Sequence, residues 1–253
     1  MEVAERRAAV VRLLREQGQV SVAELSRQLA VSEMTARRDL EFLEHEGLAR
    51  RYHGGAVTTV SRSFEVPYAA RAYERQRQKR AIGLRAAELI MPGETVIVDA
   101  GTTAFEVARA LRDRASLLVC PLGLQAAGVL ADRPGIRLLV PGGEVRPGEQ
   151  MLVGEVTRGV IAGLRFDTYV MAVGGLSRDD GFTDFSLDDV AVKQAALRSA
   201  RRCVVACDSA KVGKVGFARI GGLGVAGALV TDAELADADR AWLAEAGLDL
   251  VIA

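Results

Sequence analysis

The sequence predicts an α/β protein with two domains: a small helical domain over residues 1–57 and a mainly parallel-sheet domain over residues 74–253. Helical apolar repeats followed by a glycine-rich hairpin pattern fill the first segment. After residue 94, short apolar strand patterns alternate with helical ones. Residues 58–73 show little periodicity and are interrupted by Pro67, so we expect a linker there.

Composition excludes several classes of protein. The 253 residues are 49% hydrophobic and 26% charged, which is ordinary for a globular chain. Charged residues interrupt every apolar run in residues 1–16, so we expect no signal peptide. Pro121 and Gly123 break the longest apolar stretch, 117–131, so we expect no membrane span. Three cysteines are too few, and odd in number, for a disulfide framework, which fits a reducing cytoplasm.

Charge is unevenly distributed along the chain. Residues 1–57 hold 9 basic and 9 acidic side chains, residues 58–85 hold 7 and 2, and residues 86–253 hold 17 and 22. The basic segment between the domains indicates either an anionic partner or the solvated face of a linker helix.

Capping residues define the N-terminal helices. A first helix is expected over residues 6–17, where apolar residues repeat at helical spacing. Ser21 begins a second helix, with Glu24 placed to complete a capping box, and Ser32 begins a third. The last two helices and their short connection have the spacing of a helix-turn-helix.

On the third helix, Ala36, Leu40 and Leu43 share one face, which we expect to pack inward. The opposite face is polar and could enter a DNA major groove. Residues 48–57 predict a strand, a Gly-Gly turn and a second strand, which would form a basic wing. An exposed helix that carries only internal ion pairs is the alternative, since Arg37 lies four residues from two glutamates. The candidate DNA contacts are Ser32, Thr35, Arg37, Arg38, Arg50, Arg51 and His53.

The segment 74–91 predicts an amphipathic helix that leads into the second domain. Its apolar side includes Ile82 and Ala86, its other side is rich in Arg and Lys, and Pro92-Gly93 ends it. The basic side could lie near DNA phosphates, or it could be a solvated face.

The rest of the chain predicts a mainly parallel sheet covered by helices. Expected strands cover residues 95–99, 117–120, 137–140, 168–173, 203–206, 228–231 and 248–252. Expected helices cover residues 103–111, 122–130, 155–162, 188–201 and 240–246.

Polar residues follow several of these strands, at the sheet edge where ligands bind. The best candidate is Asp99-Ala-Gly-Thr-Thr103, in which a strand runs through a glycine into a helix that begins with hydroxyls. Free amides and the helix dipole favour phosphate at such a place, although an ordinary Thr-capped turn has the same pattern. The glycine spacing matches neither a dinucleotide site nor a P-loop.

A sugar phosphate suits the other strand ends, because lysine binds phosphate and carboxylates accept hydrogen bonds from sugar hydroxyls. Asp189 and Lys193 could instead form only a surface pair, since they are four residues apart. The candidate effector-binding residues are Asp99, Gly101, Thr102, Thr103, Gly174, Gly175, Asp189, Lys193, Asp208 and Lys211.

Catalysis is the rival function. Both histidines lie before residue 58, which removes a histidine base and histidine-ligated zinc from the second domain. Cys203 and Cys207 have no partner cluster nearby in the sequence and are expected as buried thiols. A sugar-phosphate isomerase that uses Asp99 and Lys211 remains the alternative. No metal and no cofactor are expected.

Two groups of motifs resemble the DeoR family of bacterial transcription regulators. Residues 31–40 (VSEMTARRDL) and 53–56 (HGGA) resemble its DNA-binding signature. DAGTT (99–103), DVAVK (189–193) and DSAK (208–211) resemble blocks of its effector domain. The resemblance implies a winged helix-turn-helix, an effector domain similar in fold to ribose-5-phosphate isomerase and CoA transferases, and control by phosphorylated sugars.

This sequence departs from the family at two positions. Cys120-Pro121 stands where the family usually has Thr-Asn, and Asp189 stands in place of a Glu. With the resemblance, we expect a repressor of a sugar operon that binds operator DNA and a phosphorylated sugar. It should form a homodimer or homotetramer, because one recognition helix reads only a short site.

Overall fold

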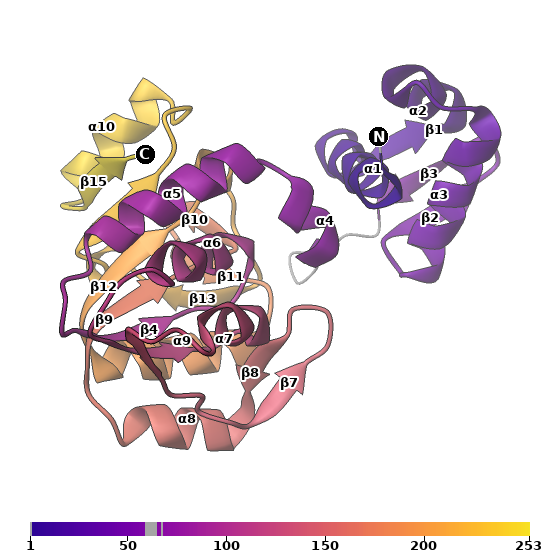
Figure 1. The fold of residues 1–253 in the computed structure, drawn as a ribbon. Coiled ribbons are helices and arrows are strands. Elements are labelled where there is room, and N and C mark those ends of the chain that lie inside the picture. The colour runs from indigo at the N-terminus through magenta and orange to yellow at the C-terminus, as the bar shows by residue number, and fades with distance from the viewer. Residues whose placement is uncertain (1, 59–64, 67) are drawn as a thin grey trace. The chain divides into compact units, whose positions relative to one another are not determined.

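The structure is a computed structural model that describes residues 2–58, 65, 66 and 68–253. The chain divides into two compact units, unit 1 over Met1–Glu74 and unit 2 over Arg75–Ala253 (Figure 1). In the segment 58–73 that we expected as linker, residues 59–64 and 67 lie outside the described residues. Tyr68–Tyr73 form a short helix, α4.

Unit 1 contains a helix-turn-helix followed by a two-stranded wing. The wing strands β2 and β3 are antiparallel, and β1 pairs with β3 on the other side. The elements are α1 (Val3–Gln17), β1 (Gln19–Ser21), α2 (Val22–Leu29), α3 (Glu33–His45), β2 (Ala49–Tyr52) and β3 (Gly55–Thr58).

The side chains expected to pack inward form the core of unit 1. Ala36, Leu40 and Leu43 of α3 are buried against residues of α1 and α2. Ser21 and Ser32 cap α2 and α3 as predicted, each accepting a hydrogen bond from an amide three residues on. Glu24 does not complete the capping box, because its carboxylate accepts from Gln28 instead.

Two boundaries in unit 1 differ from the prediction. Helix α1 begins at Val3 rather than at residue 6, because Glu2 and Glu5 form a capping box ahead of the apolar repeat. The wing turn is His53-Gly54 and not Gly-Gly, since Gly55 is already part of β3. A side chain at Gly55 would meet the Val20 carbonyl oxygen, so this strand position admits only glycine.

Unit 2 is built on a seven-stranded sheet in which all neighbouring strands are parallel. The order is β15-β14-β12-β9-β4-β5-β6, so β9 and β4 lie near the middle. Each strand corresponds to one of the seven expected. Their bounds are β4 (Thr95–Val98), β5 (Leu117–Pro121), β6 (Ile136–Leu138), β9 (Phe166–Met171), β12 (Ala200–Ala206), β14 (Ala228–Thr231) and β15 (Asp249–Ile252).

Helices cover both faces of this sheet (Figure 1). Helices α5 (Gln76–Glu88), α6 (Thr102–Leu111) and α7 (Leu124–Leu130) pack with Val96, Val98 and Val170 on one face. Helices α8 (Gly154–Ala162) and α9 (Leu187–Ser199) pack with Ile97 and Tyr169 on the other. Helix α10 (Asp237–Glu245) precedes β15. Successive side chains of each strand point to opposite faces of the sheet, and both faces are covered. The strands therefore appear in the sequence as continuous apolar runs.

Several short elements of unit 2 were not predicted, and neither was β1 in unit 1. Those of unit 2 are the hairpin of β7 (Glu144–Arg146) and β8 (Met151–Val153), and an antiparallel sheet of β10 (Gly175–Ser177), β11 (Gly181–Asp184) and β13 (Ala218–Gly221). Two turns of 3₁₀ helix, Ser209–Lys211 and Leu223–Val225, were also missed.

Some predicted helix bounds are wrong. The helix expected over 188–201 ends at Ser199, because Ala200 turns extended and pairs with Phe166 as the start of β12. Lys79, expected on the basic side of the 74–91 helix, is buried. In the described part of the chain, no helix combines the length and apolar character that crossing a membrane requires.

Candidate nucleic-acid interface and ligand site

The outer face of α3 carries exposed arginines at its N-terminal half. Arg38 is exposed and has no ion-pair partner among the described residues. Arg37 lies 3.5 Å from Glu33, the helical ion pair that we considered as the alternative. The Ser32 hydroxyl caps the helix and lies 2.9 Å from the Thr35 hydroxyl. Within the described residues, this face therefore offers one guanidinium outside any ion pair, one that is weakly paired and a hydroxyl pair.

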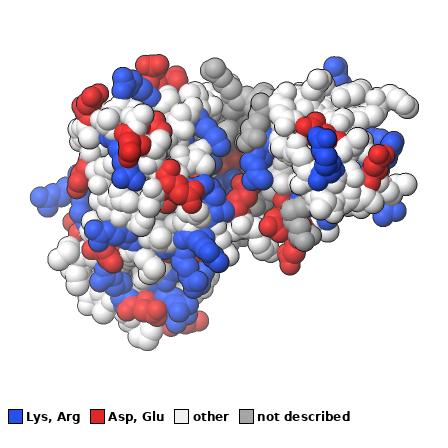
Figure 2. Space-filling view, turned by 90° about the horizontal axis from the view of Figure 1, so that it is seen from above, with Lys and Arg blue, Asp and Glu red and all other residues white. Residues whose placement is uncertain are grey.

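The wing presents two of its three candidate residues to solvent. Arg50 on β2 and His53 in the turn are exposed. The Arg51 guanidinium is 3.0 Å from Glu41, and the Arg51 amide donates to Glu44. Arg51 therefore fastens the wing to α3. On the face shown in Figure 2, Lys and Arg side chains are interspersed with Asp and Glu side chains.

A buried ion-pair cluster that we did not predict holds α3 in place. Asp39 is almost fully buried and accepts from Arg6 at 2.5 Å and from Arg7 at 3.1 Å. Hydrogen bonding to Asp39 raises the pKa of Arg6. The Arg7 guanidinium also lies over the Phe42 ring, at 3.6 Å. The sequence held a signal, because Asp39 stands three residues after the inward-facing Ala36 and a buried carboxylate requires a cation.

In unit 2, the turn after β4 leads directly into α6. Gly101 has a φ of 100°, which favours glycine, although a Cβ atom at this position would meet no other atom within 4 Å. Helix α6 begins at Thr102, and the Phe105 amide is bonded to the Gly101 carbonyl. The amides of Thr102 and Thr103 therefore have no acceptor within the helix. Both side chains are buried.

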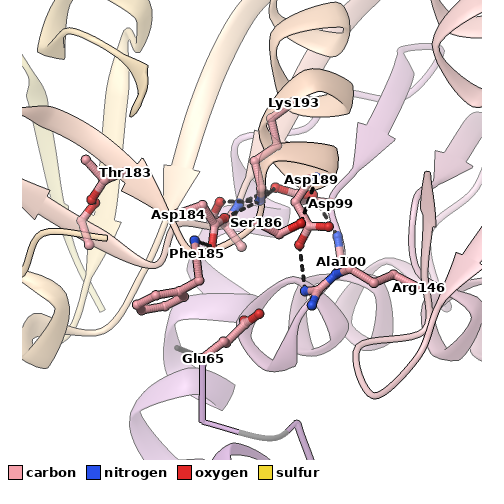
Figure 3. A network of polar contacts seen from close by, with 12 residues as sticks. Glu65, Asp99, Ala100, Arg146, Thr183, Asp184, Phe185, Ser186, Asp189 and Lys193 are labelled. Atoms are coloured by element: carbon pink, nitrogen blue, oxygen red, sulfur yellow. Dashed lines mark hydrogen bonds and ion pairs between the residues drawn. The ribbon is translucent and has the colours of Figure 1, made fainter. Parts of the chain in front are cut away.

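Lys193 lies at the centre of a buried polar network (Figure 3). Its ammonium is 2.5 Å from Asp99 and 3.3 Å from Asp184, and it donates to the Ala172 carbonyl at 2.8 Å. Burial lowers the pKa of Lys193, but the two carboxylates outweigh it, and the pKa lies above its ordinary value. The three contacts match the three protons of an ammonium group, so Lys193 is fully engaged.

Asp99 is equally enclosed. One of its oxygens accepts from Lys193, from the Tyr169 hydroxyl at 2.9 Å and from the Ala172 amide at 3.0 Å. The other oxygen accepts from the Ala100 amide at 2.8 Å. The Asp99 side chain has no exposed surface. Burial and the charge of Asp99 raise the pKa of Tyr169 well above its ordinary value, so Tyr169 donates as a neutral phenol.

Asp189 forms the outer part of the network, with Arg146 from the β7–β8 hairpin. The Arg146 Nη2 atom donates to Asp189 Oδ2 at 2.7 Å, whereas buried Asp189 Oδ1 has no partner among the described residues. Burial raises the pKa of Asp189 to about 6, although Arg146 and Lys193 act in the opposite direction. Asp184 raises it further.

The remaining candidates lie around this network or apart from it. Gly174 is buried so closely that a side chain would meet Phe185 and Asp184. Gly175 approaches the Lys214 carbonyl in the same way. The Lys211 ammonium lies 5.9 Å from the Phe185 ring. Asp208 belongs to another cluster, where Arg75 is 3.3 Å from it and 3.0 Å from Asp232.

The structure therefore brings Asp99, Asp189 and Lys193 together and adds Tyr169, Asp184 and Arg146, which the sequence had not singled out. Arg146 and Asp184 lie on short strands that carried no clear pattern. Within the described residues, no three His, Cys, Asp or Glu side chains gather as a metal site requires. The arrangement is suited to binding a polar molecule.

Comparison with known proteins gives matches along most of the chain. The family model described as "DeoR-like helix-turn-helix domain" matches residues 6–62, and "DeoR C terminal sensor domain" matches residues 74–233. The glycerol-3-phosphate regulon repressor of Escherichia coli (strain K12) is 31% identical over 92% of each chain. A putative aga operon transcriptional repressor of Escherichia coli O157:H7 is 32% identical over 85% of this chain and 81% of its own.

Among solved structures, ribose 5-phosphate isomerase A from Methanocaldococcus jannaschii is 14% identical over 55% of each chain, with a TM-score of 0.42.

Proposed function

This chain belongs to the DeoR family of transcription regulators, and we propose that it represses a sugar-related operon. Unit 1 would bind operator DNA, and a phosphorylated sugar in unit 2 would control that binding. The proposal is supported by two relatives that are named as repressors, one of a glycerol-3-phosphate regulon and one of an aga operon. A protein with this function acts in the cytoplasm, where operator DNA lies.

The proposed DNA contacts lie on the exposed face of α3 and on the wing. Arg38 and Thr35 would face base edges in the major groove, where a guanidinium can bond a guanine bidentately. Ser32 is engaged as a cap, so it would position the helix start. Arg37, Arg50 and His53 would contact phosphates, and Arg51 would set the wing against α3. Two-fold pairing of such heads in a homodimer or homotetramer would double the length of the site.

The proposed binding site for the effector's phosphate group lies at the start of α6. Gly101, Thr102 and Thr103 offer amides and hydroxyls at a helix N-terminus, which suits a phosphate group. Lys211 would supply countercharge beside Phe185. Lys193 would orient Asp99 and not bind the phosphate itself, because its protons are already shared among Asp99, Asp184 and the Ala172 carbonyl.

An isomerase is not favoured. A base in such an enzyme must reach a substrate proton, whereas Asp99 is enclosed and accepts hydrogen bonds on both oxygens. Product analysis after incubation with a bound phosphosugar tests this directly. Conversion that disappears in Asp99→Asn would restore the enzymatic alternative.

A paired ligand screen tests the proposed function. We would measure thermal shifts with glycerol 3-phosphate, glucose 6-phosphate and fructose 6-phosphate, each beside its unphosphorylated parent. Stabilisation by a phosphorylated member only is the expected result. Thr102→Val and Lys211→Ala should each weaken that binding, while operator binding without effector stays near wild type. Unchanged affinity in both variants would remove the phosphate from the start of α6.

A further inference from the structure

We propose that Arg75 transmits effector binding at the loop 208–211 to the turn where the chain enters unit 2. Arg75 acts as a positioning residue, because it contacts this loop and is itself the first residue of unit 2. The inference rests on the proposed function, since it names how the phosphorylated sugar alters DNA binding by unit 1. It gives a role to a residue that none of the sequence motifs includes.

The backbone at Arg75 makes a left-handed turn between two helices. Its φ is 50° and its ψ is 37°, a conformation that residues other than glycine rarely adopt. Helix α4 ends at Tyr73, and α5 begins at Gln76. Such a conformation persists only where the surrounding structure holds it. The turn between α4 and α5 therefore depends on what the Arg75 side chain contacts.

The Arg75 side chain contacts residues that follow two neighbouring strands of the sheet. Its Nη2 atom donates to the Ser209 hydroxyl at 2.9 Å and to Asp232 Oδ1 at 3.0 Å. Its Nε atom lies 3.3 Å from Asp208 Oδ1. Asp208 and Ser209 follow β12, and Asp232 follows β14 directly. Arg75 thus ties the turn to the sheet edge at which the effector is proposed to bind.

The two aspartates are held unequally. Asp232 also accepts from the Ser209 amide at 2.8 Å, the Ser209 hydroxyl at 2.9 Å and the Glu234 amide at 3.1 Å. Asp208 is buried as well, yet within the described part of the chain no hydrogen bond reaches its carboxylate. Buried carboxylates normally accept hydrogen bonds. The ion pair between Asp208 and Arg75 is therefore the contact that a ligand would change most readily.

The loop 208–211 joins this ion pair to the proposed countercharge of the phosphate. Within it, the Lys211 amide donates to the Asp208 carbonyl at 3.0 Å, across a turn of 3₁₀ helix. Because this bond closes the turn, a phosphate that draws Lys211 towards it would move Asp208 and Ser209 with it. A ligand that favours one position of the loop would then favour one conformation at Arg75.

The test compares how strongly a phosphorylated sugar changes operator binding by the full chain. The sugar is whichever of glycerol 3-phosphate, glucose 6-phosphate and fructose 6-phosphate stabilises the wild type. The DNA is a fragment selected for binding to the wild type. The measured quantity is the ratio of the operator Kd values with and without a saturating amount of that sugar. We expect a ratio of about 5-fold to 150-fold for wild type and below about 2-fold for Arg75→Gln, which should still bind the sugar in calorimetry.

Arg240→Gln is the matched control. Arg240 donates to the Leu235 carbonyl at 3.1 Å and to the Ala233 carbonyl at 3.0 Å, so it holds the segment after Asp232 from α10. The control removes an arginine from the same segment and leaves the turn at Arg75 in place. Its ratio should equal that of wild type.

A second variant covers the case in which Arg75→Gln does not fold. Arg75→Lys keeps the positive charge, but one ammonium does not reproduce the contacts of the guanidinium with Asp208, Asp232 and Glu234. Its ratio should be at least about 3-fold smaller than that of wild type.

The outcomes separate the inference from the function beneath it. A wild type whose operator binding does not respond to the sugar overturns both. A wild type that responds, with Arg75→Gln within about 2-fold of its ratio, overturns the inference alone. An equal loss in Arg240→Gln would make the effect a general loosening of the segment and would also overturn it. Loss of sugar binding in Arg75→Gln would make Arg75 a support of the binding site, which likewise contradicts the inference.

Discussion

Replacing Lys193 by methionine should destabilise unit 2 strongly while preserving the volume of the side chain. The Lys193 ammonium is buried and contacts two buried carboxylates and a carbonyl. Removing one partner of a buried ion pair leaves an uncompensated charge and costs about 3–5 kcal/mol. Because 1 kcal/mol lowers Tm by about 2–4 °C in a unit of this size, the expected decrease is about 6–20 °C.

Trp242, the single tryptophan, lies on α10 and reports the unfolding of unit 2 by fluorescence. Urea titrations of wild type, Lys193→Met and the double variant Lys193→Met/Asp99→Asn give the free energies of unfolding. The double variant should lose less than the sum of the two single changes, because one unpaired charge is removed. A loss below about 1 kcal/mol in Lys193→Met would refute the reasoning, since it would place the ammonium in contact with water.

Three further predictions concern single residues. Arg38→Ala should weaken operator binding by about 1–3 kcal/mol and relax specificity at one base pair, whereas an equal loss on all DNA would make it a phosphate contact. Asp39→Asn should destabilise unit 1 by about 3 kcal/mol, since two arginines lose their carboxylate, and limited proteolysis should cut the variant faster. The raised pKa of Asp189, about 6, means that the folded state holds its proton more tightly than the unfolded state. The free energy of unfolding of the wild type should therefore fall by roughly 3 kcal/mol as pH rises from about 4 to about 6. In Asp189→Asn this decrease should be absent. If the free energies of unfolding of wild type and variant change with pH in parallel, the prediction is wrong.

The sheet of unit 2 was predictable because its strands are buried on both faces. Thr95–Val98 and Ala228–Thr231 read as short apolar runs, and each became a parallel strand. The β7–β8 hairpin could not be found in this way, because its strands have three residues each and show no alternation. Arg146 was missed for that reason.

Which side chains contact each other within the site was harder to predict than which residues lie near it. The rule that strand ends meet at one sheet edge placed Asp99 in the site, and Lys193 was added to it from the helix expected over 188–201. It did not distinguish Asp208, whose carboxylate pairs with Arg75 from the start of unit 2. The spacing of Asp189 and Lys193 was equally compatible with a surface pair, whereas both side chains are buried and Lys193 contacts Asp99 and Asp184. Such choices depend on long-range contacts that periodicity does not encode.

The central claim is that a ligand in unit 2 controls DNA binding by unit 1. The most direct test is a titration of the full chain against its operator fragment, with and without a saturating amount of the phosphosugar that stabilises it. We predict a change in operator affinity of about 5-fold to 150-fold, in either direction, and none with the unphosphorylated parent. Superimposable DNA-binding curves in the presence of a phosphosugar that demonstrably binds would contradict the account.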